Sequence, residues 1–315
     1  MTEFHTAPLH KETPLWRSRP LSRLHNQEVF LKMEALQEVG SFKIRGIGHL
    51  CQQYANEGKT TLISSSGGNA GLAAAYSAET LGLKAKVFVP HTTPGFMIEK
   101  IQAYGAEVTV HGAAWDEAHQ KAEEYLGTIP HEGAMIHPFD HPRIWEGHQT
   151  IINEIADQLG KPSAIICSVG GGGLLLGILK GLQNLGWSDV EVHAVETIGA
   201  DSLHQSLQEN QRVTLDRITS KASSLGAKTV AKEAFELSRT MEVSSHLVTD
   251  SQAYEGCLLL AKDHRILTEL ACGASIASLF SNSFNPPPGP IVTIVCGGAA
   301  AALPLSTQNG DQHHD

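Results

Sequence analysis

The chain has 315 residues, of which 41% are hydrophobic and 18% are charged, so it can bury a full core and form two ordinary domains or one large one. Its formal net charge of −10 argues against a nucleic-acid partner, because proteins that bind a phosphate backbone concentrate Lys and Arg. No apolar run reaches the roughly 18 residues of a membrane span, and residues 1–16 lack the apolar segment of a secretory signal, so we expect neither a membrane partner nor secretion.

The first half of the chain alternates apolar strands with amphipathic helices from Thr60 onward. The predicted strands are Thr61–Ser65, Lys84–Pro90 and Ala106–His111, and the predicted helices are Asn69–Leu83, Thr93–Tyr104 and Trp115–Leu126. Strands separated by helices of this length predict βαβ crossovers and a parallel sheet. Residues 133–148 interrupt the rhythm with two prolines, so we interpret them as a connection between two such units.

A second series follows. Its predicted strands are Ala164–Val169, Val190–Glu196 and Ile291–Cys296, with a helix over Leu174–Leu185 and a stiff Pro-rich surface linker over 285–290. The last strand is apolar throughout, as buried parallel strands are. We therefore predict an α/β protein of two doubly wound domains with parallel sheets. Such sheets bind ligands beyond the carboxyl ends of their strands, here in the cleft between the domains.

Cysteines and histidines suggest neither disulfides nor a metal. The cysteines are scattered without a Cys-x-x-Cys pair, at Cys51, Cys167, Cys257, Cys272 and Cys296, which fits a reducing, cytoplasmic location. Among the 17 histidines there is no His-Glu-x-x-His zinc pattern. His137 and His141 have helical spacing, but Pro138 and Pro142 disrupt a helix there. We interpret the histidines as solvated or packing residues.

The hexapeptide Ser41–Gly46, Ser-Phe-Lys-Ile-Arg-Gly, places Lys43 between an aromatic ring and a glycine turn. An amine that is shielded by a ring and partly desolvated has a lowered pKa, which a Schiff-base lysine needs. A lysine on a turn is ordinarily just solvated. The motifs that follow favour the functional interpretation.

Two strand-to-helix turns have the composition of anion sites. Residues 64–71, Ser-Ser-Ser-Gly-Gly-Asn-Ala-Gly, offer backbone amides suited to a carboxylate and the donor and acceptor of Asn69, although Ser66 or Asn69 acting merely as a helix cap is an equal alternative. Four glycines, Gly170 to Gly173, can wrap their amides around a phosphate at a helix N-terminus, although a flexible turn would look the same.

The glycine run does not fit the common nucleotide signatures. No Gly-Lys-Ser/Thr follows it, which argues against ATP, and Leu175 stands where a dinucleotide fingerprint has its third glycine. Glu196 closes the next predicted strand, so glycine spacing alone leaves NAD open. Cys296, at the end of a buried strand, is by default a small core residue.

Six motifs follow one another along the chain: Gly40–Gly46, Ser65–Gly71, Pro138–His148, Ser168–Leu174, Glu269–Ala274 and Val295–Gly298. In this order they resemble the pyridoxal-phosphate enzymes of fold type II, and most closely the L-serine dehydratase/L-threonine deaminase family of animal type. The resemblance spans roughly Leu9 to Gly298.

The resemblance implies a role for each matching residue. Lys43 would form the imine with pyridoxal 5′-phosphate, and Phe42 would lie against the cofactor ring. The other implied cofactor contacts are Asn69 to the ring's 3′-oxygen, Gly170, Gly171, Gly172, Gly173 and Leu174 to the phosphate, and Cys296 to the pyridine nitrogen. The implied contacts to the substrate carboxylate are Ser66, Gly67 and Asn69. The positions that hold a monovalent cation, K⁺, in relatives are Glu196, Ala200 and Ser202.

The resemblance also implies an activity and an organisation. Lys43 would take the α-proton of L-serine or L-threonine, and loss of the β-hydroxyl would lead to pyruvate or 2-oxobutanoate and ammonia. A thiol beside the pyridine nitrogen would favour this elimination over transamination. A large cofactor-phosphate-binding domain would span 1–36 and 141–315, and a small substrate-loop domain 37–140. A homodimer is expected.

Three departures from the family pattern bear on function. Gly67 stands where the family commonly has alanine and serine racemases have serine, and glycine supplies no second base for racemisation. Ser224 falls where some relatives have the alanine on the ring's other face. After Gly298 an alanine run meets Pro304 and a polar tail, where the family continues into a terminal helix.

Four alternatives to the dehydratase remain. Serine racemase and a β-replacing synthase belong to the same fold, and a non-catalytic pyridoxal-phosphate carrier belongs to another class of function. A nicotinamide oxidoreductase is disfavoured, because Lys43 and Asn69 would then have no role.

Overall fold

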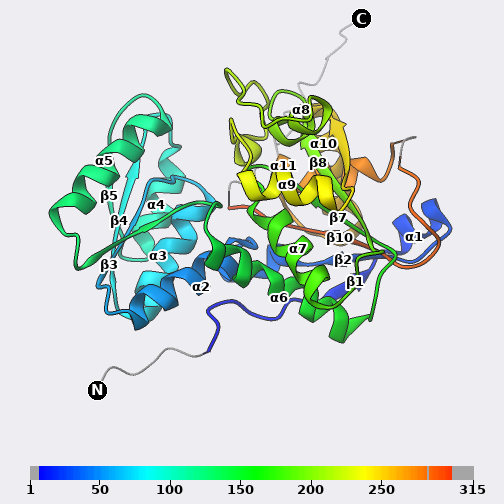
Figure 1. The fold of residues 1–315 in the computed structure, drawn as a ribbon, viewed down its shortest axis with the longest axis horizontal. Helices are drawn as coiled ribbons and strands as arrows, with labels where there is room; N and C mark the ends of the chain where they lie inside the picture. Colours follow the sequence, from blue (N-terminus) through cyan, green and yellow to red (C-terminus); the bar gives the residue numbers. More distant parts are fainter. Residues whose placement is uncertain (1–6, 282–283, 300–315) are drawn as a thin grey trace, which may run out of the picture.

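The computed structural model describes residues 7–281 and 284–299. The chain forms two lobes side by side, each built around one sheet flanked by helices (Figure 1). Within the described ranges, no helix combines the length and the apolar character needed to cross a bilayer. The expectation about the chain after Gly298 falls, Ala299 apart, on residues outside the described ranges.

The smaller sheet is parallel throughout, as the first βα series predicts. Its strands, in spatial order, are β5 (Glu107–Val110), β4 (Lys84–Val89), β3 (Thr61–Ser64) and β6 (Gly133–Ile136). Its helices are α2 (Lys43–Asn56), α3 (Asn69–Leu81), α4 (Gly95–Ala103) and α5 (Trp115–Thr128). The strands and helices predicted between Thr61 and Leu126 are confirmed, with ends that differ by one or two residues.

The interpretation of residues 133–148 as a connection is wrong at both ends. Strand β6 pairs with β3 at one edge of the small sheet, and helix α6 (Pro142–Gln158) begins inside the stretch. Pro142 occupies the first helical position, where its missing N–H costs nothing, so this proline starts a helix. Only residues 137–141 form a linker between the two elements, and we call them the β6–α6 linker.

The larger sheet contains the three strands predicted in the second half of the chain. Its strands, in spatial order, are β1 (Leu15–Arg17), β2 (Val29–Lys32), β10 (Ile291–Ile294), β7 (Ala164–Ser168), β8 (Glu191–Thr197) and β9 (Ser244–Val248). Strand β1 pairs antiparallel with β2, so this sheet is mixed at one edge and parallel elsewhere.

The helices of the larger lobe surround this sheet. The α-helices are α1 (Arg19–His25), α6, α7 (Gly173–Asn184), α8 (Ser202–Gln208), α9 (Lys232–Thr240), α10 (Asp250–Leu259) and α11 (Leu270–Ser278). The short helices are η1 (Glu34–Leu36), η2 (Ser223–Leu225) and the π-helical turn η3 (Leu260–His264). Helix α6 packs against both α2 of the small lobe and α7 of the large lobe.

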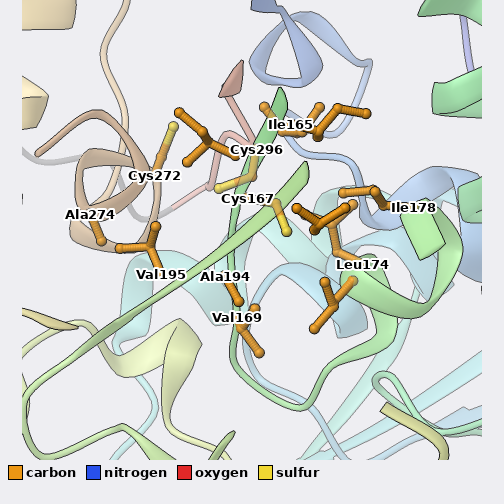
Figure 2. Packing of buried hydrophobic residues seen from close by; sticks show 14 of the residues in the cluster. Ile165, Cys167, Val169, Leu174, Ile178, Ala194, Val195, Cys272, Ala274 and Cys296 are labelled. Carbon is orange, nitrogen blue, oxygen red and sulfur yellow. The ribbon is translucent and has the colours of Figure 1, made fainter. Parts of the chain in front are cut away.

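The core of the large lobe includes Val169 and Cys296, which belong to the loops that follow β7 and β10. Figure 2 shows Cys167, Cys272 and Cys296 inside this apolar cluster, among Ile165 and Val195. All five cysteines are buried and free. Because β7 and β10 are neighbouring parallel strands, the glycine run and the Cys296–Gly297 turn open onto the same edge of a rigid sheet.

Candidate active site

Loops of both lobes line an open cavity. Its free space is about 500 Å³, including the solvent-filled entrance. Its walls are Phe42, Lys43, Asn69, Phe139, Ser168, Val169, Gly170, Gly171, Gly172, Gly173, Leu174, Leu175, Ser224, Leu225, Glu269, Ala271, Cys296 and Gly297. Aromatic and apolar side chains line it together with a lysine, a carboxylate and an amide, as in sites that bind small organic molecules.

Lys43 is the first residue of α2, and its amine faces the cavity. Its Nζ donates to the backbone carbonyl of Pro138 at 2.6 Å and lies 5.2 Å from the centroid of the Phe42 ring. Burial lowers the pKa of Lys43 to about 8, because the ammonium loses its hydration, and the nearby Glu269 carboxylate opposes this shift. A neutral amine is thus accessible near physiological pH, as the hexapeptide predicts.

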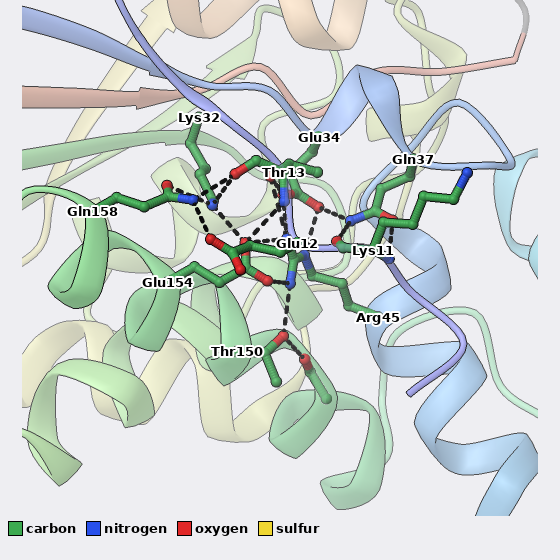
Figure 3. Close-up of polar contacts among 11 residues, drawn as sticks. Lys11, Glu12, Thr13, Lys32, Glu34, Gln37, Arg45, Thr150, Glu154 and Gln158 are labelled. Atoms are coloured by element: carbon green, nitrogen blue, oxygen red, sulfur yellow. Dashed lines mark hydrogen bonds and ion pairs between the residues drawn. The ribbon is translucent and has the colours of Figure 1, made fainter. Parts of the chain in front are cut away.

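A buried ionic cluster holds the start of α2, which has no side-chain cap (Figure 3). Arg45 binds the Glu34 carboxylate through Nε and Nη2, at 2.6 and 2.7 Å, and the Glu154 carboxylate through Nη1 and Nη2, at 2.6 and 2.8 Å. The side chains of Arg45 and Glu34 are both 0% exposed. Lys32 completes the charge balance through its ion pair with Glu154. Helix α2, which begins at Lys43, is therefore fixed to η1 and α6 of the large lobe.

The backbone before Lys43 is tied to the turn after β10. The Phe42 N–H donates to the Cys296 carbonyl at 3.1 Å, and the Gly298 N–H donates to the Gly40 carbonyl at 2.8 Å. Gly297 has φ +79°, and a Cβ there would lie 2.1 Å from the Gly40 oxygen, so only glycine fits. This pairing holds Lys43 and Cys296 at fixed positions in one cavity.

The glycine run forms a cradle at the N-terminus of α7. Gly172 caps the helix with φ +90° and no side-chain bond. A Cβ at Gly171 would lie 2.3 Å from the Phe139 ring, and a Cβ at Gly170 would lie 3.0 Å from Leu225. Because these positions have no side chains, backbone amides can reach a bound anion at the positive end of a helix. The cradle fits a phosphate group.

The turn after β3 presents Asn69 to the cavity. Its Nδ2 donates to Glu269 Oε1 at 2.9 Å, and its Oδ1 accepts from the Ala299 N–H at 2.7 Å. The alternative that Ser66 or Asn69 merely caps a helix is wrong, since the cap of α3 is Gly68 and makes no side-chain bond. Ser66 and Gly67 lie on the same turn but are not among the residues that line the cavity.

The side chain of Thr93 occupies the space next to Gly67. A Cβ at this position would lie 2.6 Å from both Oγ1 and Cγ2 of Thr93, so the space that a larger residue would use is already filled.

Cys296 lines the cavity as a neutral thiol. Its pKa lies well above the ordinary value, because the neighbouring Cys272 sulfur and burial both favour the protonated S–H form of Cys296. Replacing Cys296 with a carboxylate would therefore change the charge next to any bound ring.

Phe139 and Glu269 also line the cavity, although the resemblance implies no role for them. Their places inside the motifs Pro138–His148 and Glu269–Ala274 are the sequence signal that could have indicated them. Ser224, noted as a departure from the family pattern, also lines the cavity.

The residues expected to hold a cation do not line this cavity. Glu196 is the penultimate residue of β8, and its carboxylate accepts from the N–H groups of Leu203 and His204 at 3.0 and 2.6 Å. Burial raises its pKa to about 8. The described part of the chain contains no group of three or more His, Cys, Asp or Glu side chains suited to a metal ion.

Comparison with known proteins agrees with this geometry. The pattern of the family described as "Pyridoxal-phosphate dependent enzyme" matches residues 6–297. The chain is 45% identical to mouse "Serine dehydratase-like", over 92% of this chain and 91% of that protein. It is 43% identical to human "L-serine dehydratase/L-threonine deaminase", over 94% and 93%.

A solved structure agrees with the fold as well as the sequence. The fungal L-serine ammonia-lyase from Rhizomucor miehei superposes with a TM-score of 0.87 at 35% identity, over 93% of this chain and 96% of that one. The lysine amine and the glycine cradle, which line one cavity, fit the aldehyde and the phosphate of pyridoxal phosphate. The chain belongs to the family of pyridoxal-phosphate-dependent enzymes.

Proposed function

We propose that the protein removes water and then ammonia from L-serine and L-threonine, giving pyruvate and 2-oxobutanoate. One observation carries the proposal: the Lys43 amine, the Gly170–Gly173 cradle and the Cys296 thiol line a single cavity. Relatives that share more than two fifths of their residues with this chain bear the name L-serine dehydratase/L-threonine deaminase.

Pyridoxal phosphate supplies an aldehyde that condenses with amines and a ring that withdraws electrons from the bound amino acid. We assign Lys43 to covalent attachment through Nζ, and Phe42 to one face of the ring. The glycines of the cradle and Leu174 are assigned to the phosphate, and Asn69 to the ring's 3′-oxygen.

With an amino-acid substrate attached to the cofactor, Lys43 would have a free amine beside the substrate. Burial lowers the pKa of this amine to about 8 in the cofactor-free protein, so a neutral amine that can take the α-proton is present near neutral pH. We assign Ser66, Gly67 and Asn69 to the substrate carboxylate, because the turn after β3 offers backbone and side-chain donors at the start of α3.

The neutral Cys296 thiol favours elimination. A thiol with a raised pKa does not protonate a pyridine nitrogen beside it, so the ring withdraws electrons less strongly than it does next to a carboxylate. A ring that withdraws electrons less strongly would favour loss of the β-hydroxyl over transamination. Gly67 offers no second base, which favours dehydration over racemisation.

Product analysis tests the proposal. The purified full chain, with pyridoxal phosphate added, is incubated with L-serine and separately with L-threonine. Release of pyruvate and 2-oxobutanoate supports the dehydratase. D-serine as the main product would instead indicate a racemase, and sulfide-dependent cysteine formation a β-replacing synthase. The cofactor's visible absorbance without any turnover would indicate a non-catalytic carrier.

The organisation of the protein forms part of the proposal. We propose a large domain of residues 1–36 and 141–315 and a small domain of residues 37–140, a division supported by the two separate sheets. We also propose a homodimer in the cytoplasm, where the five free cysteines stay reduced.

We propose a K⁺ ion at Glu196, Ala200 and Ser202. The support is the Ser202 hydroxyl, which is buried without a hydrogen-bond partner among the described residues. Equal activity in K⁺ and in tetramethylammonium buffers would contradict this site.

A further inference from the structure

The β6–α6 linker touches two parts of the cavity that must act together. The Pro138 carbonyl accepts the hydrogen bond from Lys43 Nζ at 2.6 Å. The next residue, Phe139, closes the glycine cradle: a Cβ at Gly171 would lie 2.3 Å from its ring, and a Cβ at Gly173 would lie 2.8 Å from its carbonyl oxygen. Two adjacent linker residues thus contact the lysine and the phosphate cradle.

Two side chains, His137 and Trp145, fix the orientation of the Pro138–Phe139 dipeptide. His137 Nδ1 accepts from the backbone N–H groups of Phe139 and Asp140, at 3.2 and 2.7 Å. In a planar trans peptide the Phe139 N–H and the Pro138 carbonyl point in opposite directions, so fixing one aims the other at Lys43. Burial and the nearby Lys43 charge lower the pKa of His137 to about 4, which keeps its ring neutral and able to accept.

Trp145 makes the second attachment. Its indole Nε1–H donates to the Phe139 carbonyl at 2.9 Å. Trp145 stands in the first turns of α6, and its ring packs against the hydrophobic cores of both lobes. The Lys180 ammonium lies over this ring, 5.5 Å from its centroid. Lys180 belongs to α7, the helix that begins in the glycine cradle.

We propose that Trp145 is a positioning residue that couples the lysine to the phosphate cradle through the Phe139 carbonyl. By holding the Phe139 carbonyl, the indole N–H fixes the Pro138–Phe139 dipeptide. The Pro138 carbonyl then accepts from Lys43, and the Phe139 ring contacts Gly171. This inference deepens the proposed function and rests on it, because it assumes a cofactor that carries both an aldehyde and a phosphate.

Two fragments of the cofactor separate the two contacts. Pyridoxal has the aldehyde without the phosphate and reports on the lysine. Pyridoxine 5′-phosphate has the phosphate without the aldehyde and reports on the cradle. Their dissociation constants are measured by absorbance and by calorimetry on the cofactor-free full chain. Pyridoxal phosphate itself is measured alongside them.

Trp145→Phe keeps an aromatic ring and removes only the indole N–H. The loss of one hydrogen bond should weaken both fragments, each by roughly threefold to tenfold. Trp16→Phe, at the exposed edge strand β1, is the matched control and should change neither constant. Phe139→Leu keeps the backbone carbonyl but removes the ring, so it should weaken pyridoxine phosphate and leave pyridoxal nearly unchanged.

The outcomes are distinct. Unchanged constants for both fragments in Trp145→Phe overturn the coupling, as does weakening of one fragment alone. A lower melting temperature with unchanged dissociation constants would show that Trp145 has a structural role only, and this result would also overturn the coupling. If Trp145→Phe does not fold, His137→Leu removes the other attachment and should weaken pyridoxal by a similar factor; an unchanged constant there refutes the idea. Failure of the wild type to bind pyridoxal phosphate overturns the proposed function itself, which the other outcomes leave intact.

Discussion

The amine of Lys43 should titrate near pH 8 in the cofactor-free protein, whereas an ordinary lysine titrates near 10.5. At pH 7 a pKa of about 8 leaves about a tenth of the amine neutral, against about three parts in ten thousand at the ordinary value. The site therefore holds about 300-fold more of the form that attacks an aldehyde. The cause is burial of the ammonium beside the Phe42 ring, with Glu269 acting in the opposite direction.

Labelling of the amine measures this titration. The cofactor-free chain is exposed briefly to acetic anhydride between pH 6 and pH 11, and the modification of the Lys43 peptide is followed by mass spectrometry. The midpoint should lie near 8. Glu269→Gln should move it lower, because the carboxylate that stabilises the ammonium is gone. A midpoint near 10.5 would show an amine in contact with water, and an upward shift in Glu269→Gln would contradict the electrostatic argument.

Three further substitutions test separate parts of the account. Arg45→Met leaves the buried Glu34 and Glu154 carboxylates without their guanidinium, so urea denaturation should show a loss of about 3–5 kcal/mol; a loss within error would mean that the cluster does not hold α2. Cys296→Asp should protonate the pyridine nitrogen and increase transamination products from serine, whereas an unchanged product ratio would count against the electronic argument. His193 is almost fully buried and its pKa is about 4, so between pH 6.5 and pH 4 the unfolded chain takes up a proton at this residue before the folded chain does. This site alone should lower stability by about 3 kcal/mol over that range; His193→Gln should make the pH dependence shallower, and an equal slope would refute it.

The sequence patterns predict the buried parallel strands well and the edges of the large sheet poorly. Every residue of β3 and β7 is buried, and Leu or Ile stands at the centre of both strands, so their burial is visible in their composition. Strand β2 ends in Lys32, which is fully buried because Glu154 neutralises it from 122 residues away. A partner so distant in sequence is not visible in a local pattern. Strand β1 is short and largely exposed, so its residues carry no periodic signal.

In the site as well, residues that stand in compact motifs could be predicted, whereas contacts between residues far apart in the sequence could not. Lys43, Asn69, the glycine run and Cys296 stand in compact motifs at the ends of strands and helices, and the fold brings all of them to one cavity. Glu269 reaches Asn69 across 200 residues, and neither motif alone indicates this bond. Phe139 contacts the glycine cradle only because α6 packs against both α2 and α7, which is a property of the assembled fold.

Covalent trapping at Lys43 tests the central claim most directly. The wild-type chain and Lys43→Ala are each mixed with pyridoxal phosphate, reduced with borohydride, digested and analysed by mass spectrometry. We predict that the wild type carries the reduced adduct on the Lys43 peptide and that Lys43→Ala carries none. Full retention of the adduct in Lys43→Ala, on another lysine, would contradict the account.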